Sequence, residues 1–179
     1  MKNTLKLMLA ILLAFSMFAC NEEKLTLEDM REAEASLMGD DWTMNMDVAP
    51  QVAKKYCKFV EQNPNDTTAP AWLFHAMEIN IKLEELDKSI KLGNQLLEQY
   101  PESKWAPRTL FFMANYIYDE RLHDLDKARV TYEQLIRDYP NSDLVDDAKL
   151  SIEYLGLSPE EILYMRSLSQ MDETEEENF

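Results

Sequence analysis

The chain has 179 residues, of which 46% are hydrophobic, and it carries a net charge of −16 from 34 acidic and 18 basic residues. Nucleic-acid phosphates are bound by clustered lysine and arginine, so this charge argues against nucleic acid as a partner. Glycine occurs at only three distant positions, Gly39, Gly93 and Gly156, which excludes the glycine-rich loops that hold nucleotide phosphates. The length and the hydrophobic content suffice for one domain with a core.

The first twenty residues have the order of a secretory signal. Lys2 and Lys6 precede an apolar segment, 7–18, and small Ala19 precedes Cys20. An apolar run of this length is too short to span a bilayer and is typical of a signal peptide. The pattern resembles the lipobox of bacterial lipoproteins, in which the cysteine is acylated and becomes the mature N-terminus. The alternative is an ordinary signal peptide that is cleaved elsewhere.

The lipoprotein resemblance implies a signal peptide at 1–19, lipidation of Cys20 and a lipid-anchored linker at 20–26. It also implies a location in the bacterial cell envelope, at the outer membrane and facing the periplasm. Surface exposure stays open, because Glu22 and Glu23 follow the cysteine. No other stretch is long and apolar enough to span a bilayer, so the membrane is contacted only through the lipid. Cys57 then has no disulfide partner in the chain.

The rest of the chain predicts helices, because apolar residues recur with helical spacing and β-branched alternation is absent. Thr26 and Asp29 have the spacing of a capping box at the first helix, and Ser158 and Glu161 have it at a last one. We expect an irregular segment at 39–47 and a disordered acidic tail at 169–179. The main predicted helices are 27–38, 48–62, 68–82, 85–99, 104–120, 125–138 and 143–155.

An internal repeat ends at three prolines. Pro64, Pro101 and Pro140 are 37 and 39 residues apart, and each follows an amphipathic run. Proline ends a helix because it cannot continue the hydrogen-bond ladder. Two residues after each proline stands a residue able to cap the next helix, such as Ser103. Pro107 then falls in a first helical turn, where backbone donors are unpaired anyway.

The repeats resemble tetratricopeptide repeats, whose helix pairs place small and aromatic residues at set distances before a closing proline. Ala128 and Tyr132 stand 12 and 8 residues before Pro140, and Ala114 fits the small position of the preceding helix. Ser89 and Gly93 replace the corresponding residues in the unit before, which is degenerate. The resemblance implies an all-α, short right-handed solenoid of antiparallel helix pairs over 27–168, with about eight helices after the signal peptide. The longer spacing resembles that of envelope members, such as the lipoprotein of the outer-membrane β-barrel assembly machine and the Tol-Pal-associated periplasmic coordinator.

The search for catalytic and metal-binding patterns leads to a prediction of no enzyme, no cofactor and no metal. The chain has no Gly-x-Ser-x-Gly, Cys-x-x-Cys or His-Glu-x-x-His sequence. His75 and His123 lack the converging ligands that zinc requires. Cys57 is interpreted as a small buried hydrophobe.

The helix at 104–120 carries the candidate binding residues. If Ala114 marks the close approach of two helices, a set of five residues faces the concave groove, where relatives hold peptides. Exposed aromatics with arginine and asparagine suit peptide binding, although these residues could equally cover the neighbouring helix. The set is Arg108, Phe111, Asn115, Tyr118 and Asp119.

The sequence thus predicts a lipid-anchored envelope scaffold or adaptor that binds another envelope protein or a peptide segment, in outer-membrane or cell-wall assembly. This rests on analogy with the family. Two alternatives stay open. One is a glycan- or peptide-binding protein or hydrolase accessory of the envelope, and the other is a structural lipoprotein that binds its own copy.

Overall fold

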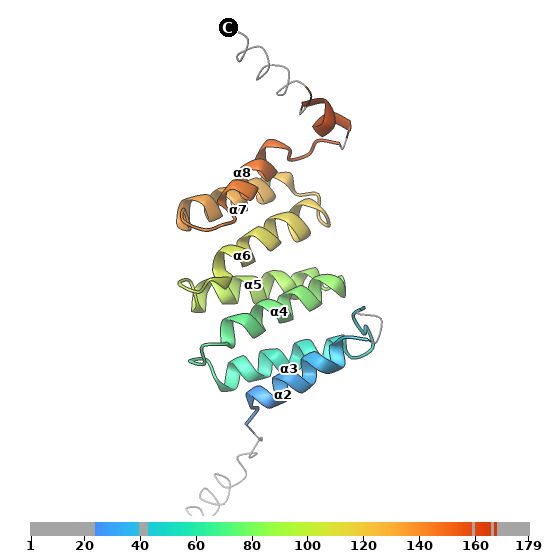
Figure 1. The fold of residues 1–179 in the computed structure, drawn as a ribbon, viewed down its shortest axis with the longest axis vertical. Coiled ribbons are helices and arrows are strands. Elements are labelled where there is room, and N and C mark those ends of the chain that lie inside the picture. The colour runs from blue at the N-terminus through green and yellow to red at the C-terminus, as the bar shows by residue number, and fades with distance from the viewer. Residues whose placement is uncertain (1–23, 40–42, 159, 166, 168–179) are drawn as a thin grey trace, which may run out of the picture.

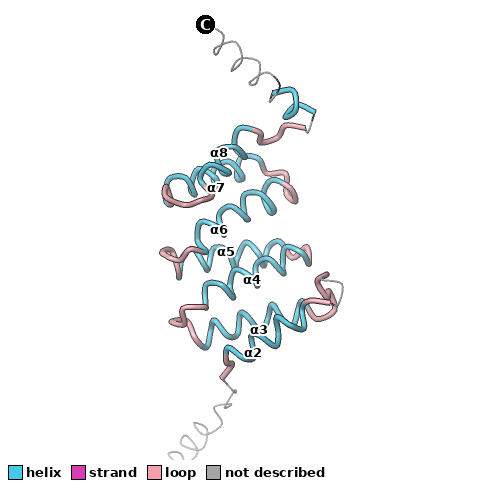
Figure 2. The backbone as a smooth tube through the Cα atoms, viewed as in Figure 1, coloured by secondary structure: helices cyan, strands magenta, loops and turns pink. Residues whose placement is uncertain are grey.

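A computed structural model describes residues 24–39, 43–158, 160–165 and 167, and in these residues every regular element is helical (Figures 1 and 2). The predicted all-α class is therefore confirmed. The predicted signal peptide, Cys20 and the acidic tail lie outside the described residues. The elements are α2 (Leu27–Leu37), α3 (Ala49–Gln62), α4 (Ala69–Lys82), α5 (Leu86–Gln99), α6 (Trp105–Phe112), the π-helix η2 (Met113–Asp119), α7 (Leu125–Asp138) and α8 (Val145–Glu153).

The helices stack along the long axis of the molecule in chain order, from α2 at one end to α8 at the other (Figure 1). Short loops along the two edges join them (Figure 2). Helices α2, α4, α6–η2 and α8 are the first helices of successive units, and α3, α5 and α7 are the second. Successive helices pack against each other, which is the predicted solenoid of antiparallel helix pairs.

The three proline turns have the same hydrogen bonds. The residue before each proline, namely Asn63, Tyr100 or Tyr139, donates its N–H back to the helix that ends there. The side chains of Asp66, Ser103 and Ser142 each accept the N–H two residues further on, at 2.8, 3.2 and 3.2 Å. These side chains close the turn but do not cap the next helix, so the predicted capping role is wrong. The N-cap residues are Thr68, Lys104 and Leu144, and none of them makes a side-chain capping hydrogen bond. The sequence repeat is thus also a repeat of backbone structure.

Tyrosines join successive turns. The Tyr100 hydroxyl donates to the carbonyl of Pro64 at 3.0 Å, and the Tyr139 hydroxyl donates to the carbonyl of Pro101 at 2.9 Å. Each tyrosine precedes the proline of its own unit and reaches back to the proline of the unit before. The Tyr-Pro pair therefore both ends a helix and sets the spacing of neighbouring units.

We expect Tyr100→Phe and Tyr139→Phe each to lower the free energy of unfolding by about 0.5–1.5 kcal/mol, the net value of one hydrogen bond. The ring remains, so packing is unchanged. Urea denaturation followed by circular dichroism measures the effect. Tyr164→Phe is the control, because Tyr164 is 64% exposed and lies outside the proline turns. An equal loss from all three variants would contradict a special role for the Tyr-Pro contacts.

The core consists of three apolar clusters that overlap along the stack. Met30, Tyr56 and Phe59 belong to the first, at α2, α3 and α4. The second lies at α4, α5 and the α6–η2 helix and includes Leu96. The third joins that helix to α7 and α8 around Tyr132. Because neighbouring clusters share a helix, burial continues from one end of the array to the other.

The small positions predicted from the repeat are buried. Ala114 and Ala128 are both 0% exposed, as expected where two helices approach closely. In the degenerate unit, which contains Ser89 and Gly93, other residues fill the corresponding space. A Cβ atom at Gly93 would lie 2.5 Å from Met113 Sδ and 3.1 Å from Met77 Sδ, so these methionines occupy the space of the missing aromatic residue. Ser89 is also buried and its hydroxyl donates to the Met77 carbonyl at 3.2 Å.

The helix predicted at 104–120 is present, but only its first half is α-helical, because α6 continues as the π-helix η2. Glu120 N–H donates to the Asn115 carbonyl and Leu122 N–H donates to the Ile117 carbonyl, each at 2.9 Å and each five residues back. This wider turn lets the loop satisfy carbonyls that a regular helix end would leave without donors. Tertiary packing sets this change of register, and the sequence pattern did not indicate it.

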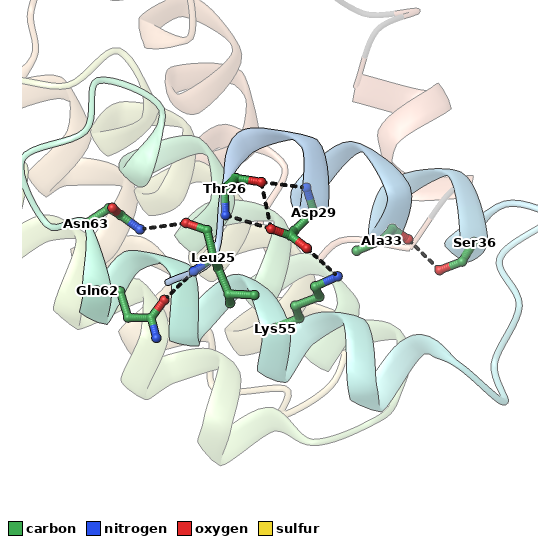
Figure 3. Close-up of polar contacts among 8 residues, drawn as sticks. All are labelled: Leu25, Thr26, Asp29, Ala33, Ser36, Lys55, Gln62 and Asn63. Atoms are coloured by element: carbon green, nitrogen blue, oxygen red, sulfur yellow. Dashed lines mark hydrogen bonds and ion pairs between the residues drawn. The ribbon is translucent and has the colours of Figure 1, made fainter. Parts of the chain in front are cut away.

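The N-terminal end of the array is held by side chains of α3 and of Asn63, which follows it (Figure 3). The predicted capping box of Thr26 and Asp29 is confirmed. Just before it, Leu25 N–H donates to Gln62 Oε1 at 2.8 Å, and Asn63 Nδ2 donates to the Leu25 carbonyl at 3.4 Å. The chain is thus fixed in place from Leu25 onward. At the other end the predicted capping box of Ser158 and Glu161 is confirmed, and residues 160–165 are helical.

Candidate functional site

Two grooves lie between successive first helices. The smaller, which we call the α4–η2 groove, has a volume of about 330 Å³. The larger, the η2–α8 groove, has a volume of about 660 Å³ and also borders the closing segment 155–162. The α4–η2 groove is lined by Glu78, Ile81, Lys82, Phe112, Tyr116, Glu120 and Arg121. The η2–α8 groove is lined by Asn115, Asp119, His123, Leu125, Leu150, Ser151, Tyr154, Leu155, Gly156, Leu157, Ser158, Glu161 and Ile162.

Asn115 and Asp119 are brought together in the η2–α8 groove, as part of the predicted binding set. Asn115 Oδ1 accepts from the Tyr132 hydroxyl at 3.4 Å, and its Nδ2 donates to Glu120 Oε1 at 3.4 Å. These two contacts orient the amide. Burial raises the pKa of Asp119 above its ordinary value, the nearby Glu120 adds to the rise, and His123 partly opposes it.

The other three members of the predicted set lie elsewhere. Arg108 is exposed, and its guanidinium lies 5.7 Å from the centre of the Trp105 ring. Phe111 packs edge to face on Tyr132 in the third cluster, with ring centres 5.5 Å apart. Tyr118 packs against the second cluster, and Lys127 lies over its ring at 5.7 Å. The structure therefore places the predicted set in different surroundings and not in one groove.

Sequence reasoning missed most of the groove walls. Phe112 and Tyr116 line the α4–η2 groove, and their rings are 4.9 Å apart. The far wall of the η2–α8 groove comes from α8 and from the closing segment, to which no binding role was given. The signal that could have found these residues is the repeat itself, because a groove between first helices takes residues from the next first helix as well.

His75 lies in an aromatic cluster formed by α4 and α6. Its ring is 5.3 Å from Trp105 and 6.0 Å from Trp72, and its Nδ1 is 2.8 Å from Glu78 Oε2. These contacts agree with the predicted packing or surface role. Elsewhere in the described residues, too, no group of three or more His, Cys, Asp or Glu side chains could hold a metal ion. None of the described helices is long and apolar enough to cross a membrane.

Cys57 is half-buried on α3 and packs against the first cluster. Burial raises the pKa of its thiol to about 11, and the nearby Glu61 adds to this. At pH 7 the thiolate fraction is then roughly one in ten thousand, against about one in a hundred for a thiol at the ordinary value. The geometry supports the interpretation of Cys57 as a small hydrophobe.

In the Cys20→Ser chain, where Cys57 is the single thiol, we expect iodoacetamide to react on the order of 100-fold more slowly at pH 7 than it does with a free cysteine peptide. The rate should rise about tenfold per pH unit up to pH 10, because the thiolate is the reacting form. Mass spectrometry of the alkylated protein gives the rate. A rate that levels off below pH 9 would show that the thiol is more acidic than its burial implies.

The comparison with protein families finds one match. Residues 114–142 match the model of the tetratricopeptide repeat family. This segment runs from η2 through α7 to the third proline turn, and it contains Ala114, Ala128, Tyr132 and Pro140. Neither the curated proteins nor the solved structures give a match. Together with the helical stack, the family match shows a tetratricopeptide-like helical-repeat protein, a class whose members usually mediate contacts between proteins and are usually not enzymes.

Proposed function

We propose that the chain is a lipid-anchored adaptor of the bacterial cell envelope that binds another envelope protein through the grooves between its first helices. The observation that carries this proposal is the η2–α8 groove, because it is a wide cleft of mixed aliphatic and polar lining on the face where repeat arrays of this class hold their partners. Outer-membrane or cell-wall assembly is the leading setting. The proposed site of the anchor is Cys20.

The N-terminal contacts bear on how such an adaptor would sit on a membrane. Leu25 is held by Gln62 and Asn63, so only residues 21–24 separate a lipid on Cys20 from the folded array. Five residue steps span about 17 Å at most. The α2 end of the stack would therefore stay near the bilayer. The elements that form the η2–α8 groove lie toward the opposite end of the stack (Figure 1), so the groove would be farther from the bilayer and open to a partner.

A photo-crosslinking experiment in cells tests the proposal. Leu150 is 43% exposed and lines the η2–α8 groove, whereas Val130 is 61% exposed on α7 and lines neither groove. With a benzophenone amino acid at each position in turn, we expect an adduct to another protein from position 150 and little from position 130. The same chain with Cys20→Ser should leave the membrane fraction, take up no labelled fatty acid and lose most of the adduct.

Equal adducts from positions 150 and 130 would contradict the groove as the binding site. An unchanged membrane fraction in the Cys20→Ser chain, with no fatty-acid label in the wild type, would contradict the anchor and leave the binding site as a separate question.

A further inference from the structure

The η2–α8 groove combines an aliphatic wall with carboxylates, and His123 is the one basic side chain among its lining residues. Leu125 and Leu150 are 38% and 43% exposed there, beside Leu155, Leu157 and Ile162. Asp119 and Glu161 are its charged residues, and neither lysine nor arginine lines it. Two other cavities differ in this respect. The α4–η2 groove contains Lys82 and Arg121, and the cavity between α3 and α5 contains three lysines.

The two carboxylates differ in how the protein stabilises their negative charge. Glu161 accepts the Ser158 N–H at 2.8 Å as part of the capping box, and these hydrogen bonds lower its pKa. Asp119 is half-buried on η2, and none of the ion pairs in the described part of the chain joins it to a lysine or arginine. A carboxylate that has lost part of its water and is paired with no lysine or arginine favours a ligand that supplies a positive charge.

Backbone geometry holds the closing segment against this site. Gly156 has φ of +81°, a value that side chains other than glycine rarely allow, and a Cβ atom there would lie 2.8 Å from Leu125 Cδ1. His123, which also lines the groove, has a positive φ of 50° as well. The tight approach at Gly156 sets Leu125 beside the segment that carries Glu161 and Ile162. The apolar and acidic residues of the groove are thereby placed next to each other.

From this arrangement we infer that the η2–α8 groove binds a basic, apolar segment of a partner protein, with one lysine or arginine near Asp119 and an aliphatic side chain against Leu125 and Leu150. The inference rests on the proposed function and names the chemistry of the partner. Charge complementarity selects this occupant over two others. The chain's own tail has five acidic residues between 172 and 177, and a second copy brings a net charge of −16, so both would be repelled by the groove.

Peptide titration with the full chain in detergent tests the inference. The probe is a labelled ten-residue peptide with one arginine between two leucines, and matched peptides carry glutamate or norleucine in place of the arginine. We expect the arginine peptide to bind at least about tenfold more tightly than the glutamate peptide at low salt, since one partly buried charge contact is worth about that ratio. Fluorescence anisotropy gives the dissociation constants.

Asp119→Asn is the decisive variant because it keeps the shape of the side chain. We expect it to raise the dissociation constant of the arginine peptide about tenfold and to leave that of the norleucine peptide unchanged. Folding raises the pKa of Asp119 and so disfavours its charged form, and the neutral variant should melt at the same temperature as the wild type or slightly higher. Glu133→Gln is the matched control, because Glu133 is exposed on α7 and lies outside both grooves. It should change neither the dissociation constant of the arginine peptide nor the melting temperature.

Three results would overturn the inference. They are equal binding of the three peptides, no binding of the arginine peptide at millimolar concentration, and a concentration-dependent dimer that excludes the peptide in sedimentation. If any of these appears while the position-150 adduct persists, the groove still binds a partner and only the partner chemistry is wrong. If position 150 instead gives no more crosslinked adduct than position 130, the proposed function is refuted.

Discussion

Tyr132→Ala is expected to lower the free energy of unfolding by about 3–5 kcal/mol, because it removes a large, fully buried ring. Tyr132 is 0% exposed, lies in the third cluster and packs edge to face on Phe111. Natural domains are stable by only about 5–15 kcal/mol, so the variant should be partly unfolded at 37 °C. Denaturant titration followed by circular dichroism gives the value.

Two further substitutions separate packing from hydrogen bonding at this position. Tyr132→Phe removes only the hydroxyl that donates to Asn115 Oδ1 at 3.4 Å, a long contact, and should cost about 1 kcal/mol or less. Glu133→Ala is the neighbouring exposed position and should stay within about 0.5 kcal/mol of the wild type. A small loss for Tyr132→Ala, similar to that of Glu133→Ala, would show that the third cluster is not a packed core.

Gly93→Leu is expected to destabilise the fold by about 1–3 kcal/mol, through overpacking where α4, α5 and η2 meet. Its first added atom would already lie 2.5 Å from Met113 Sδ and 3.1 Å from Met77 Sδ. The higher helix propensity of leucine offsets about 1 kcal/mol at most, which is less than the cost of displacing two buried methionines. Thermal melting of the variant and of the wild type measures the difference.

A double substitution tests the physical reason for this loss. Met113→Ala alone leaves a cavity and should cost about 2–5 kcal/mol, because Met113 is 3% exposed. Added to Gly93→Leu, it opens the space that the leucine needs. We therefore expect the double variant to be more stable than the sum of the two single losses predicts, by about 1 kcal/mol or more. Simple additivity would mean that residues 93 and 113 do not compete for space.

The separation of the predicted binding set into different surroundings has a structural cause. The set was chosen on one helix with regular α-helical register, and that helix changes to a π-helix after Phe112. Phe111 and Tyr118, seven residues apart across this change, therefore do not share one face and pack against different clusters. Asn115 and Asp119, four residues apart and both within η2, still point into the same groove. Phe111, on the α6 side of the change, packs on α7 instead.

Local chemistry was sufficient to predict where the helical segments lie, where the proline turns end them, and the repeat. Proline cannot continue a helix, and a short oxygen-bearing side chain two residues later satisfies a free N–H, so Pro64, Pro101 and Pro140 mark the same turn wherever they occur. The capping boxes at Thr26 and Ser158 follow from the same local rules. Small Ala114 and Ala128 indicated close helix contacts because the family pattern gives those positions a fixed meaning.

Only the tertiary structure decided how distant segments meet. The back-reaching hydroxyls of Tyr100 and Tyr139, the methionines that fill the space at Gly93, and the π-helical register of η2 all depend on what packs against each residue. The η2–α8 groove likewise takes its walls from three segments that are brought together by the turn at Gly156. Hydrophobic spacing along the chain determines which side of a helix is buried, but it does not determine which neighbour covers that side or where two neighbours leave a gap.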